Sequence, residues 1–436
     1  MPICRHNTPK HNTRESRSVA TLFTNIRIFD GTPCPPRAGQ VLVAGETIAR
    51  VAFAPETISA PDAEVVDGAG AVLMPGMVEA HAHLTWASSV EQIYHAFILP
   101  PEELEVAATR NARVLLDHGF TSAYSAGALG DGIEVRLATA IAAGHTPGPR
   151  LIPSTLERSP EGGEGVDTGD VFNGRGPAAM RAFMAYCAAQ GIGSVKLVIS
   201  GEDALKPGSH ADLNYTAEEM DAAREAAREH GLWIATHAYT DEAVDLALRA
   251  GARIIYHASY ISEATIAKLA AHRHAVFYAP GCGVSVAALE ASPPPHVDMG
   301  AMKASAAERM ALEGRLVPAL KAAGVRVLVG GDYGFPFNPN GRNARDLAHF
   351  VDYFGYTPAE ALSAATALGG ELMGLKVGRI AEGWLADLLL VDGDPTQDVT
   401  LLQDKNRLTA IMIGGAFHKA PPASTQNTHS TQTTVA

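Results

Sequence analysis

The pattern of apolar and polar positions divides the chain into two kinds of segment. Residues 19–73 carry short apolar runs rich in Val, Ile, Leu and Phe, with Gly and Asp turns between them, which predicts β-strands. Between residues 74 and 332, short apolar runs alternate with longer stretches of helical pattern, as in parallel sheets whose strands are connected by helices. Strand patterns return over 378–380, 386–391 and 408–413. We expect the two chain ends to form one small β module, with the α/β segment inserted between them.

The α/β segment contains enough candidate strands to close a barrel. Eight strand–helix repeats predict a (β/α)8 TIM barrel, and 436 residues are sufficient for such a barrel and a smaller module. The predicted strands cover 72–83, 121–126, 150–154, 194–200, 233–238, 253–258, 275–279 and 325–332.

Two helices have ends that the sequence marks clearly. Thr216 and Glu219 form a capping-box pattern, and Gly231 follows the last helical position. A second capping-box pattern, at Thr357 and Glu360, begins a helix that we expect to continue to residue 373 and to close the barrel.

These assignments divide the chain into five consecutive parts. The first is polar and basic without the apolar core of a secretory signal, and the last is rich in Thr, Ser, Gln and Pro. We expect both to be disordered, and we take the cytoplasm as the default location. The parts are a leader over 1–18, the first portion of the β module over 19–73, the barrel over 74–376, the second portion of the β module over 377–419, and a tail over 420–436.

Composition narrows the class of protein further. Apolar residues make up 47% of the chain and charged residues 19%, as in a globular protein with a large core. The 47 acidic residues outnumber the 34 basic ones, which argues against nucleic-acid binding. No run approaches the roughly 18 apolar residues of a membrane span. The four cysteines are far apart in the sequence and are expected to be free thiols.

The chemistry of the chain begins with His81 and His83. Side chains of a strand alternate between its faces, so both imidazoles point to one side and could bind one cation. Two buried, hydrogen-bonded histidines would explain this pair equally well.

Further functional side chains at the ends of the predicted strands decide between these interpretations. Active sites of barrels lie at the carboxyl ends of the strands, where one lysine, one aspartate and four histidines are found. Imidazole and carboxylate ligands suit zinc, with manganese, iron and cobalt as alternatives. The candidate metal ligands are His81, His83, Lys196, His237, His257 and Asp332.

Lys196 points to two metal ions rather than one. An uncompensated ammonium inside a strand is costly, although its long chain could also reach solvent. If CO2 carboxylates the amine, the resulting carbamate has two oxygens that can bridge a metal pair. Two metals supply a bridging hydroxide and polarise a carbonyl, while Asp332 can transfer the proton to a leaving amine. We therefore assign catalytic roles to Lys196 and Asp332.

These motifs resemble the metal-dependent amidohydrolase superfamily. The similarity is to the branch with imidazolonepropionase-like, Xaa-Pro dipeptidase-like, ochratoxin-hydrolysing and phenylurea-hydrolysing enzymes, and it extends from about residue 22 to 418. The motifs that carry it lie at 73–83, 195–196, 236–238, 256–258, 331–332 and 377–388.

The resemblance implies a fold, a ligand set and an assembly. The expected fold is a distorted (β/α)8 barrel beside a β-sandwich, in a homo-oligomer of two to eight chains. His81, His83 and Asp332 would hold the more buried metal and His237 and His257 the other. Lys196 would be the carboxylated bridge between two ions, most simply Zn²⁺.

The sequence departs from the family pattern beside the pocket. Many relatives have Gly after the histidine of strand six, where this chain has Ala258. Glycine-rich loops at 162–165 and 334–342 could cover the site or merely connect elements. The candidate substrate contacts are Trp86, Tyr215, Tyr239, Tyr260 and Tyr278.

The expected activity is hydrolysis of a C–N bond beside a carbonyl by a metal-bridging hydroxide. Small-molecule substrates in this class are amides, dipeptides, carbamates and ureas, and the aromatic residues near the strand ends favour a hydrophobic aryl amide such as an ochratoxin-like N-acyl amino acid. A mononuclear deaminase or cyclic-imide hydrolase of the same fold is one alternative. A non-catalytic assembly protein is another, and the intact ligand set argues against it.

Overall fold

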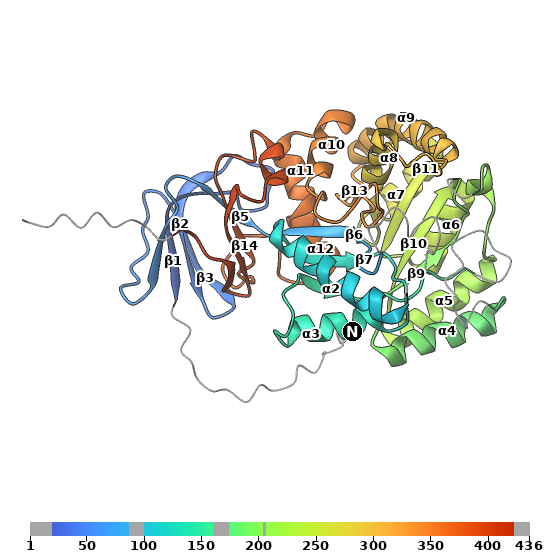
Figure 1. The fold of residues 1–436 in the computed structure, drawn as a ribbon, viewed down its shortest axis with the longest axis horizontal. Coiled ribbons are helices and arrows are strands. Elements are labelled where there is room, and N and C mark those ends of the chain that lie inside the picture. The colour runs from blue at the N-terminus through green and yellow to red at the C-terminus, as the bar shows by residue number, and fades with distance from the viewer. Residues whose placement is uncertain (1–19, 87–99, 160–173, 204–205, 423–436) are drawn as a thin grey trace, which may run out of the picture.

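The computed structural model describes residues 20–86, 100–159, 174–203 and 206–422. It consists of a β-sheet at one end and a larger α/β body at the other (Figure 1). The predicted leader over 1–18, most of the predicted tail and the glycine-rich loop at 162–165 lie outside the described residues.

The two ends of the chain meet in one mixed sheet. Its strand order is β16-β15-β14-β5-β1-β2-β3, with β4 paired to β1. The antiparallel pairing of β14 with β5 joins the late strands to the early ones (Figure 1). The strands hydrogen-bond as a single eight-stranded sheet, and the segment expected as a strand over 378–380 is not one. The strands are β1 (Thr21–Ile28), β2 (Arg37–Ala44), β3 (Thr47–Phe53), β4 (Glu64–Asp67), β5 (Val72–Pro75), β14 (Leu388–Val391), β15 (Leu408–Ile413) and β16 (Ala416–Lys419).

The α/β body contains parallel strands at the eight expected places. They form a three-stranded sheet, β6-β7-β8, and a five-stranded sheet, β13-β12-β11-β10-β9. Single parallel bridges, Arg158–Leu197 and Ala82–Tyr333, connect the margins of the two sheets. The structure therefore shows two open parallel sheets, and the closed barrel remains a prediction. The strands are β6 (Met77–Ala82), β7 (Phe120–Ser125), β8 (Arg150–Ile152), β9 (Ser194–Val198), β10 (Trp233–Thr240), β11 (Ile254–Tyr260), β12 (Phe277–Ala279) and β13 (Arg326–Val327).

Gly76 interrupts what the apolar pattern predicts as one strand. A Cβ atom at this position would lie 2.0 Å from Thr121 Oγ1, so only glycine lets the chain pass β7 this closely. The chain changes sheets at this point, because β5 pairs with β14 and β6 pairs with β7. The strand that leads to His81 and His83 thus begins directly at the junction of the two parts of the molecule.

The helices of the α/β body follow the predicted capping residues closely. Both capping boxes form, at Thr216 and at Thr357, and Gly231 ends its helix in the left-handed conformation with φ 70°. The predicted helix over 358–373 is instead two helices, because the backbone breaks at Thr366, whose hydroxyl bonds the Leu362 carbonyl. The helices are α2 (Pro101–Asp117), α3 (Ile133–Ala142), α4 (Pro177–Gln190), α5 (Ala217–His230), α6 (Asp241–Ala250), α7 (Glu263–Ala271), α8 (Cys282–Glu290), α9 (Gly300–Ala322), α10 (Arg345–Phe354), α11 (Pro358–Ala365) and α12 (Ala367–Met373), with short 3-10 helices η1 (Ser209–Ala211) and η2 (Val399–Gln403).

Apolar side chains fill the space between the strands and these helices. One continuous cluster of buried residues spans the α/β body and includes Leu389, Val391 and Leu408 of the mixed sheet. The two parts of the molecule therefore share a core rather than only a polar contact. None of the described helices is long and apolar enough to cross a membrane.

Candidate metal centre

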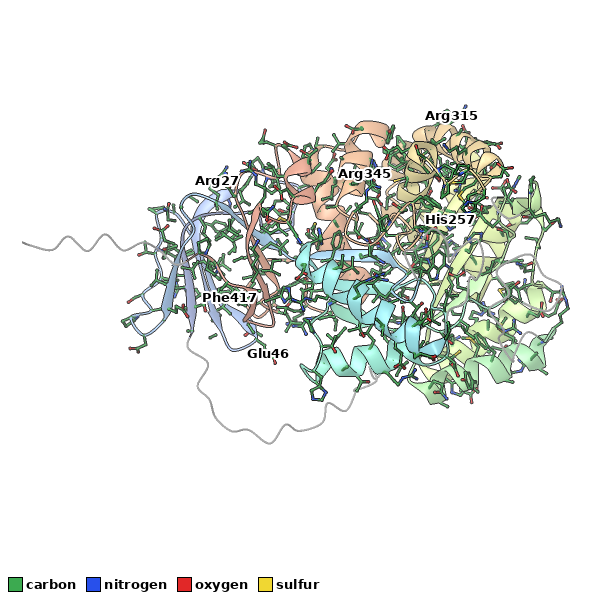
Figure 2. All side chains as sticks on the ribbon, viewed as in Figure 1. Arg27, Glu46, His257, Arg315, Arg345 and Phe417 are labelled. Atoms are coloured by element: carbon green, nitrogen blue, oxygen red, sulfur yellow. The ribbon has the colours of Figure 1, made fainter. Side chains whose placement is uncertain are left out.

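Four histidines and one aspartate meet at the carboxyl ends of the parallel strands. The ring centroid of His81 lies 5.2 Å from that of His83 and 5.3 Å from that of His257, and the centroids of His237 and His257 are 4.6 Å apart. Asp332 Oδ1 lies 3.1 Å from His83 Nε2 and 3.5 Å from His81 Nε2. Donor atoms of His81, His257 and Asp332 all lie within 4.8 Å of one another. The labelled His257 locates this cluster in the α/β body (Figure 2).

Strand register places Lys196 and His237 on the same face. β9 and β10 pair with Lys196 opposite Ala235 and Val198 opposite His237. Because side chains alternate with a period of two, Lys196 points to the same side as Val198 and hence as His237. Tyr256 of β11 also pairs with His237 and shares this face.

A left-handed backbone turns His257 toward the cluster. In a regular strand His257 would point away from the face occupied by Tyr256 and His237. Instead φ is 72° at His257 and 48° at Ala258. Asp332 also adopts a positive φ, 59°. Such conformations cost roughly 1–3 kcal/mol in non-glycine residues and concentrate at functional sites, so the strain is itself a mark of this cluster.

The donor atoms of the cluster fit a cation. His81 Nδ1 is buried without a hydrogen-bond partner among the described residues, and Asp332 Oδ1 makes no well-directed hydrogen bond although His83 Nε2 is close. Burial lowers the pKa of His81, His237 and His257, and the positive charge of Lys196 adds to this effect. Neutral imidazoles are the form that binds metal, so these residues suit a divalent ion.

Neighbouring groups orient the ring of His83 and favour the ionised form of Asp332, as metal binding by these two side chains would require. His83 Nδ1 lies 3.0 Å from the Gly127 carbonyl oxygen, which leaves Nε2 directed at Asp332. Burial alone would raise the pKa of Asp332. The adjacent His83 and the charges of Lys196 and Arg309 outweigh this effect and hold that pKa below its ordinary value. Asp332 is thus ionised in the folded protein.

Glu157 belongs to the cluster although no sequence pattern identifies it. Lys196 Nζ donates to the Ala126 carbonyl at 2.7 Å and lies 3.6 Å from Glu157 Oε1, which is 3.8 Å from His83 Nδ1. A Cβ atom at Gly127 would lie 2.4 Å from the Glu157 side chain, so this glycine makes room for the carboxylate. Glu157 supplies a counter-charge to the buried ammonium, which the sequence alone left uncompensated.

Two of the predicted substrate contacts touch the histidines directly. The Trp86 ring stacks on His83 with centroids 4.0 Å apart. The Tyr239 ring lies 4.8 Å from His237 and 5.1 Å from His257. Both aromatic residues therefore pack directly against the candidate metal ligands, and their contact with substrate stays a prediction.

The other three predicted contacts lie farther out. Tyr260 is partly exposed, and its ring centroid is 5.9 Å from that of Tyr239. The Tyr215 hydroxyl donates to a backbone carbonyl of the segment after β8 at 2.6 Å. Tyr278 is fully buried and its hydroxyl donates to the His257 carbonyl at 2.7 Å, so it positions that ligand. We do not retain Tyr215 and Tyr278 as proposed substrate contacts.

Buried charged residues behind the ligands were also missed by the sequence analysis. Glu79 accepts from the His81 backbone N–H at 2.9 Å and from Asn343 Nδ2 at 2.7 Å, and burial raises its pKa to about 8. The buried Arg309 guanidinium donates to the Tyr239 hydroxyl. An acid inside an apolar strand is a usable signal for Glu79, whereas an arginine in a helix far along the chain gives none.

The buried carboxyl group of Glu313 should make the stability of the protein depend on pH. Burial raises its pKa to about 7, although Arg309 and a 2.8 Å hydrogen bond from Ser259 act in the opposite direction. The folded state therefore keeps this proton where the unfolded state has lost it, and the contribution to stability falls as pH rises from about 4.5 to 7. We expect Glu313→Gln to raise the free energy of unfolding of chelated protein at pH 8, on the order of 3 kcal/mol, with little change at pH 4.5.

Denaturant titration across this pH range measures the effect. The matched control is Glu308→Gln, an exposed glutamate of the same helix, which should shift stability little at any pH. If the difference in the free energy of unfolding between Glu313→Gln and the parent does not vary with pH, the raised pKa of Glu313 is contradicted.

The geometry defines a class of enzyme before any comparison is made. Buried histidines, an aspartate and a lysine at the carboxyl ends of parallel strands are features of a hydrolase with a metal centre. The chain belongs to the Amidohydrolase family, whose sequence profile matches residues 72–417. The resemblance inferred from the strand-end motifs is thereby confirmed.

Individual relatives are distant but cover most of the chain. Ochratoxinase of Aspergillus niger is 24% identical over 380 residues, which span 80% of this chain and 76% of the relative. Imidazolonepropionase of Rubrobacter xylanophilus is 26% identical over 425 residues, or 88% and 91% of the two chains. The crystal structure of a Xaa-Pro dipeptidase with bound methionine has a TM-score of 0.79 at 22% identity, covering 92% of this chain and 100% of that one. This last likeness shows a shared fold.

Proposed function

We propose that the protein hydrolyses an amide-type C–N bond next to a carbonyl with the help of two divalent metal ions. The observation that carries the proposal is the convergence of four histidines, Asp332 and Lys196 from five separate strands. In a closed barrel, which we also propose for the α/β body, this end of the strands is where active sites lie.

The residues present divide into two ligand groups. His81, His83 and Asp332 would hold one ion, and His237 and His257 the other. A bound pair of Zn²⁺ ions would polarise the substrate carbonyl and lower the pKa of water. Asp332, whose Oδ1 lies 3.1 Å from His83 Nε2, can accept the proton of the attacking water and pass it to the leaving amine.

Lys196 has two possible states in this arrangement. As an ammonium it pairs with Glu157 at 3.6 Å. As a CO2-derived carbamate it would lose its positive charge and gain two oxygens facing the histidines. We propose the carbamate for the metal-loaded enzyme, in which Glu157 no longer has a cationic partner on this lysine and is free to turn toward the histidines or solvent.

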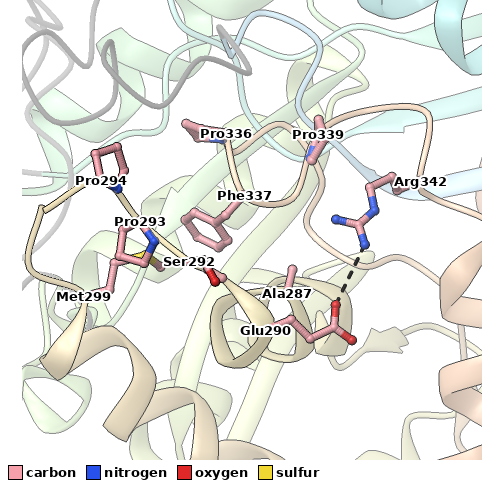
Figure 3. A pocket seen from close by; sticks show the side chains of 11 residues that line it. Ala287, Glu290, Ser292, Pro293, Pro294, Met299, Pro336, Phe337, Pro339 and Arg342 are labelled. Carbon is pink, nitrogen blue, oxygen red and sulfur yellow. Dashed lines mark ion pairs between the residues drawn. The ribbon is translucent and has the colours of Figure 1, made fainter.

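A cavity beside α8 would accommodate a bulky, apolar substrate group. It has a volume of about 400 Å³ and an Arg342–Glu290 ion pair on one side (Figure 3). Aromatic contacts lead from it to the cluster, since Phe337 stacks on Phe335 at 5.3 Å and Phe335 meets Trp86 at 4.4 Å. We propose that this region receives the aryl part of an aryl amide. The lining residues are Ala287, Glu290, Ala291, Ser292, Pro293, Pro294, Met299, Pro336, Phe337, Pro339 and Arg342.

Truncation of Phe337 tests the substrate assignment. Phe337→Ala removes one wall of the cavity, and we expect kcat/KM for N-acyl aryl amino acids to fall about 10-fold while small dipeptide amides change little. The matched control is Phe417→Ala, a partly buried phenylalanine in the mixed sheet at the far end of the molecule (Figure 2). Equal losses for aryl and small substrates would remove the cavity from the proposal.

Hydrolysis itself is tested on a panel of N-acyl amino acids, phenylureas, carbamates and Xaa-Pro dipeptides. Zinc-loaded protein should release amine from at least one of these classes, chelated protein should not, and added Zn²⁺ should restore the rate. Activity that survives exhaustive chelation would overturn the metal-dependent mechanism.

A mononuclear enzyme of the same family is the second candidate. The observation in its favour is that only His81, His257 and Asp332, among the cluster's described residues, place donor atoms within 4.8 Å of one another. One bound ion per chain at this centre, with full activity, would favour a deaminase or cyclic-imide hydrolase.

The cytoplasmic location and the homo-oligomeric state expected from the sequence stay predictions.

A further inference from the structure

A second group of potential metal ligands lies outside the strand-end cluster. Cys282 begins α8, directly after β12, while Asp346 and His349 lie three residues apart on α10. All three are buried, and one donor atom from each lies within 4.8 Å of the other two. His349 Nδ1 is 3.0 Å from Asp346 Oδ1. Two helices thus bring three kinds of metal-binding side-chain group together: a thiol, a carboxylate and an imidazole.

One carboxylate oxygen of this group lacks a hydrogen-bond partner among the described residues. Asp346 has no exposed surface, and its Oδ2 has no hydrogen-bond partner among the described residues. Tyr333 donates to the other oxygen, Oδ1, at 2.9 Å. A buried carboxylate oxygen left without a donor is costly, and a cation would remove that cost.

Two glycines make the space for the Asp346 carboxylate. A Cβ atom at Gly283 would lie 2.6 Å from Asp346 Oδ1, and one at Gly331 would lie 2.3 Å from Oδ2. Gly331 directly precedes Asp332, and Tyr333 directly follows it. The carboxylate is therefore packed against the turn that carries the aspartate of the strand-end cluster.

Two further buried acids lie near Asp346. Glu79 and Glu313 are both buried near Asp346, and each interacts electrostatically with it. Of the arginines nearby, Arg309 interacts with Glu313, and Arg345 donates to the surface Glu290 and also interacts electrostatically with Asp346.

We propose that Cys282, Asp346 and His349 bind a single zinc-type divalent cation at a site separate from the strand-end cluster. Thiolate, imidazole and carboxylate are the donors that Zn²⁺ and Co²⁺ prefer. Binding forms a metal–sulfur bond and releases the thiol proton to solvent. The ion is structural: it fastens α8 to α10 behind the turn around Asp332, and Tyr333 orients the Asp346 carboxylate.

Cobalt spectroscopy distinguishes this site from the strand-end cluster, which has no sulfur ligand. The protein tested is a Cys4→Ser/Cys34→Ser parent, chelated, desalted and titrated with Co²⁺ alone. Thiolate coordination should give a near-ultraviolet sulfur-to-cobalt charge-transfer band whose amplitude at saturation corresponds to one thiolate-bound Co²⁺ per chain. The band should persist in a His83→Ala variant, which impairs only the other centre. This outcome does not depend on whether the protein hydrolyses amides.

Three substitutions test the assignment of the ligands. The band should vanish in Cys282→Ser and His349→Ala, and Asp346→Asn, which keeps the side-chain shape, should weaken Co²⁺ binding at least about 10-fold. Cys187→Ser is the matched control, because this thiol is equally buried but elsewhere in the core, and the band should remain. Elemental analysis should find one zinc fewer per chain in Cys282→Ser than in Cys187→Ser. Absence of the band in the parent, or its survival in Cys282→Ser, would overturn the proposal, and circular dichroism verifies that each variant is folded.

Discussion

Replacing Asp332 by Asn is expected to lower kcat about 1,000-fold, the effect of removing a positioned proton carrier from a hydrolytic site. The amide has the size of the carboxylate but cannot take a proton from water. Asp332 Oδ1 lies 3.1 Å from His83 Nε2, so the substitution also removes the negative charge that faces this ligand. Steady-state kinetics on the best substrate of the panel, together with metal analysis of the same sample, measures both effects.

The metal content separates the two roles of Asp332. A variant that keeps its metal but loses kcat has lost proton transfer, whereas a variant that loses metal has lost a ligand. Asp352→Asn, an exposed aspartate of α10, is the control and should behave as the parent. A fully loaded Asp332→Asn enzyme with undiminished kcat would refute the proposed role.

Replacing Lys196 by Ala is expected to weaken metal binding at least about 100-fold and to reduce kcat/KM about 1,000-fold. The truncation removes the only side chain of the cluster that can become a bridging carbamate. In the metal-free protein the truncation also removes the ammonium that lies 3.6 Å from Glu157 Oε1. If the carbamate is the functional state, millimolar acetate or propionate should restore part of the activity, because a small carboxylate can occupy the vacated space.

A second measurement tests the carbamate directly. Protein loaded with zinc in the presence of 13C-bicarbonate should show a carbamate carbon resonance that is absent from Lys196→Ala and retained in Lys268→Ala, an exposed lysine paired with Asp245. A fully active enzyme with no carbamate resonance, or an active Lys196→Ala variant with one metal per chain, would favour the mononuclear alternative.

The sequence predicts the order of elements and most of the candidate ligands because both depend on local pattern. Alternation within strands is enough to place His81 with His83, and strand ends are enough to select Lys196, His237 and Asp332. His257 is also selected as a candidate, but its orientation depends on positive φ angles at His257 and Ala258 that the sequence does not predict.

Features that arise from contacts between distant segments could not be predicted in this way. Glu157 lies on an irregular segment, and its importance comes from the approach of Lys196 and from the space left by Gly127. The division of one apolar run into β5 and β6 at Gly76 depends on the Thr121 side chain of another strand. Whether the strands close into a barrel depends equally on long-range pairing, which a single sequence does not specify.

The pairing of β5 with β14 has a consequence for how the protein is made. While the chain emerges from the ribosome, β1 to β5 are available early, but the partner of β5 arrives only after the entire α/β body has been synthesised. A nascent chain therefore carries an exposed strand edge for most of its synthesis, and such edges promote association with other chains. Truncated products that end before residue 388 should therefore bind strongly to molecular chaperones. In the completed chain, β14 pairs with β5 and covers this edge.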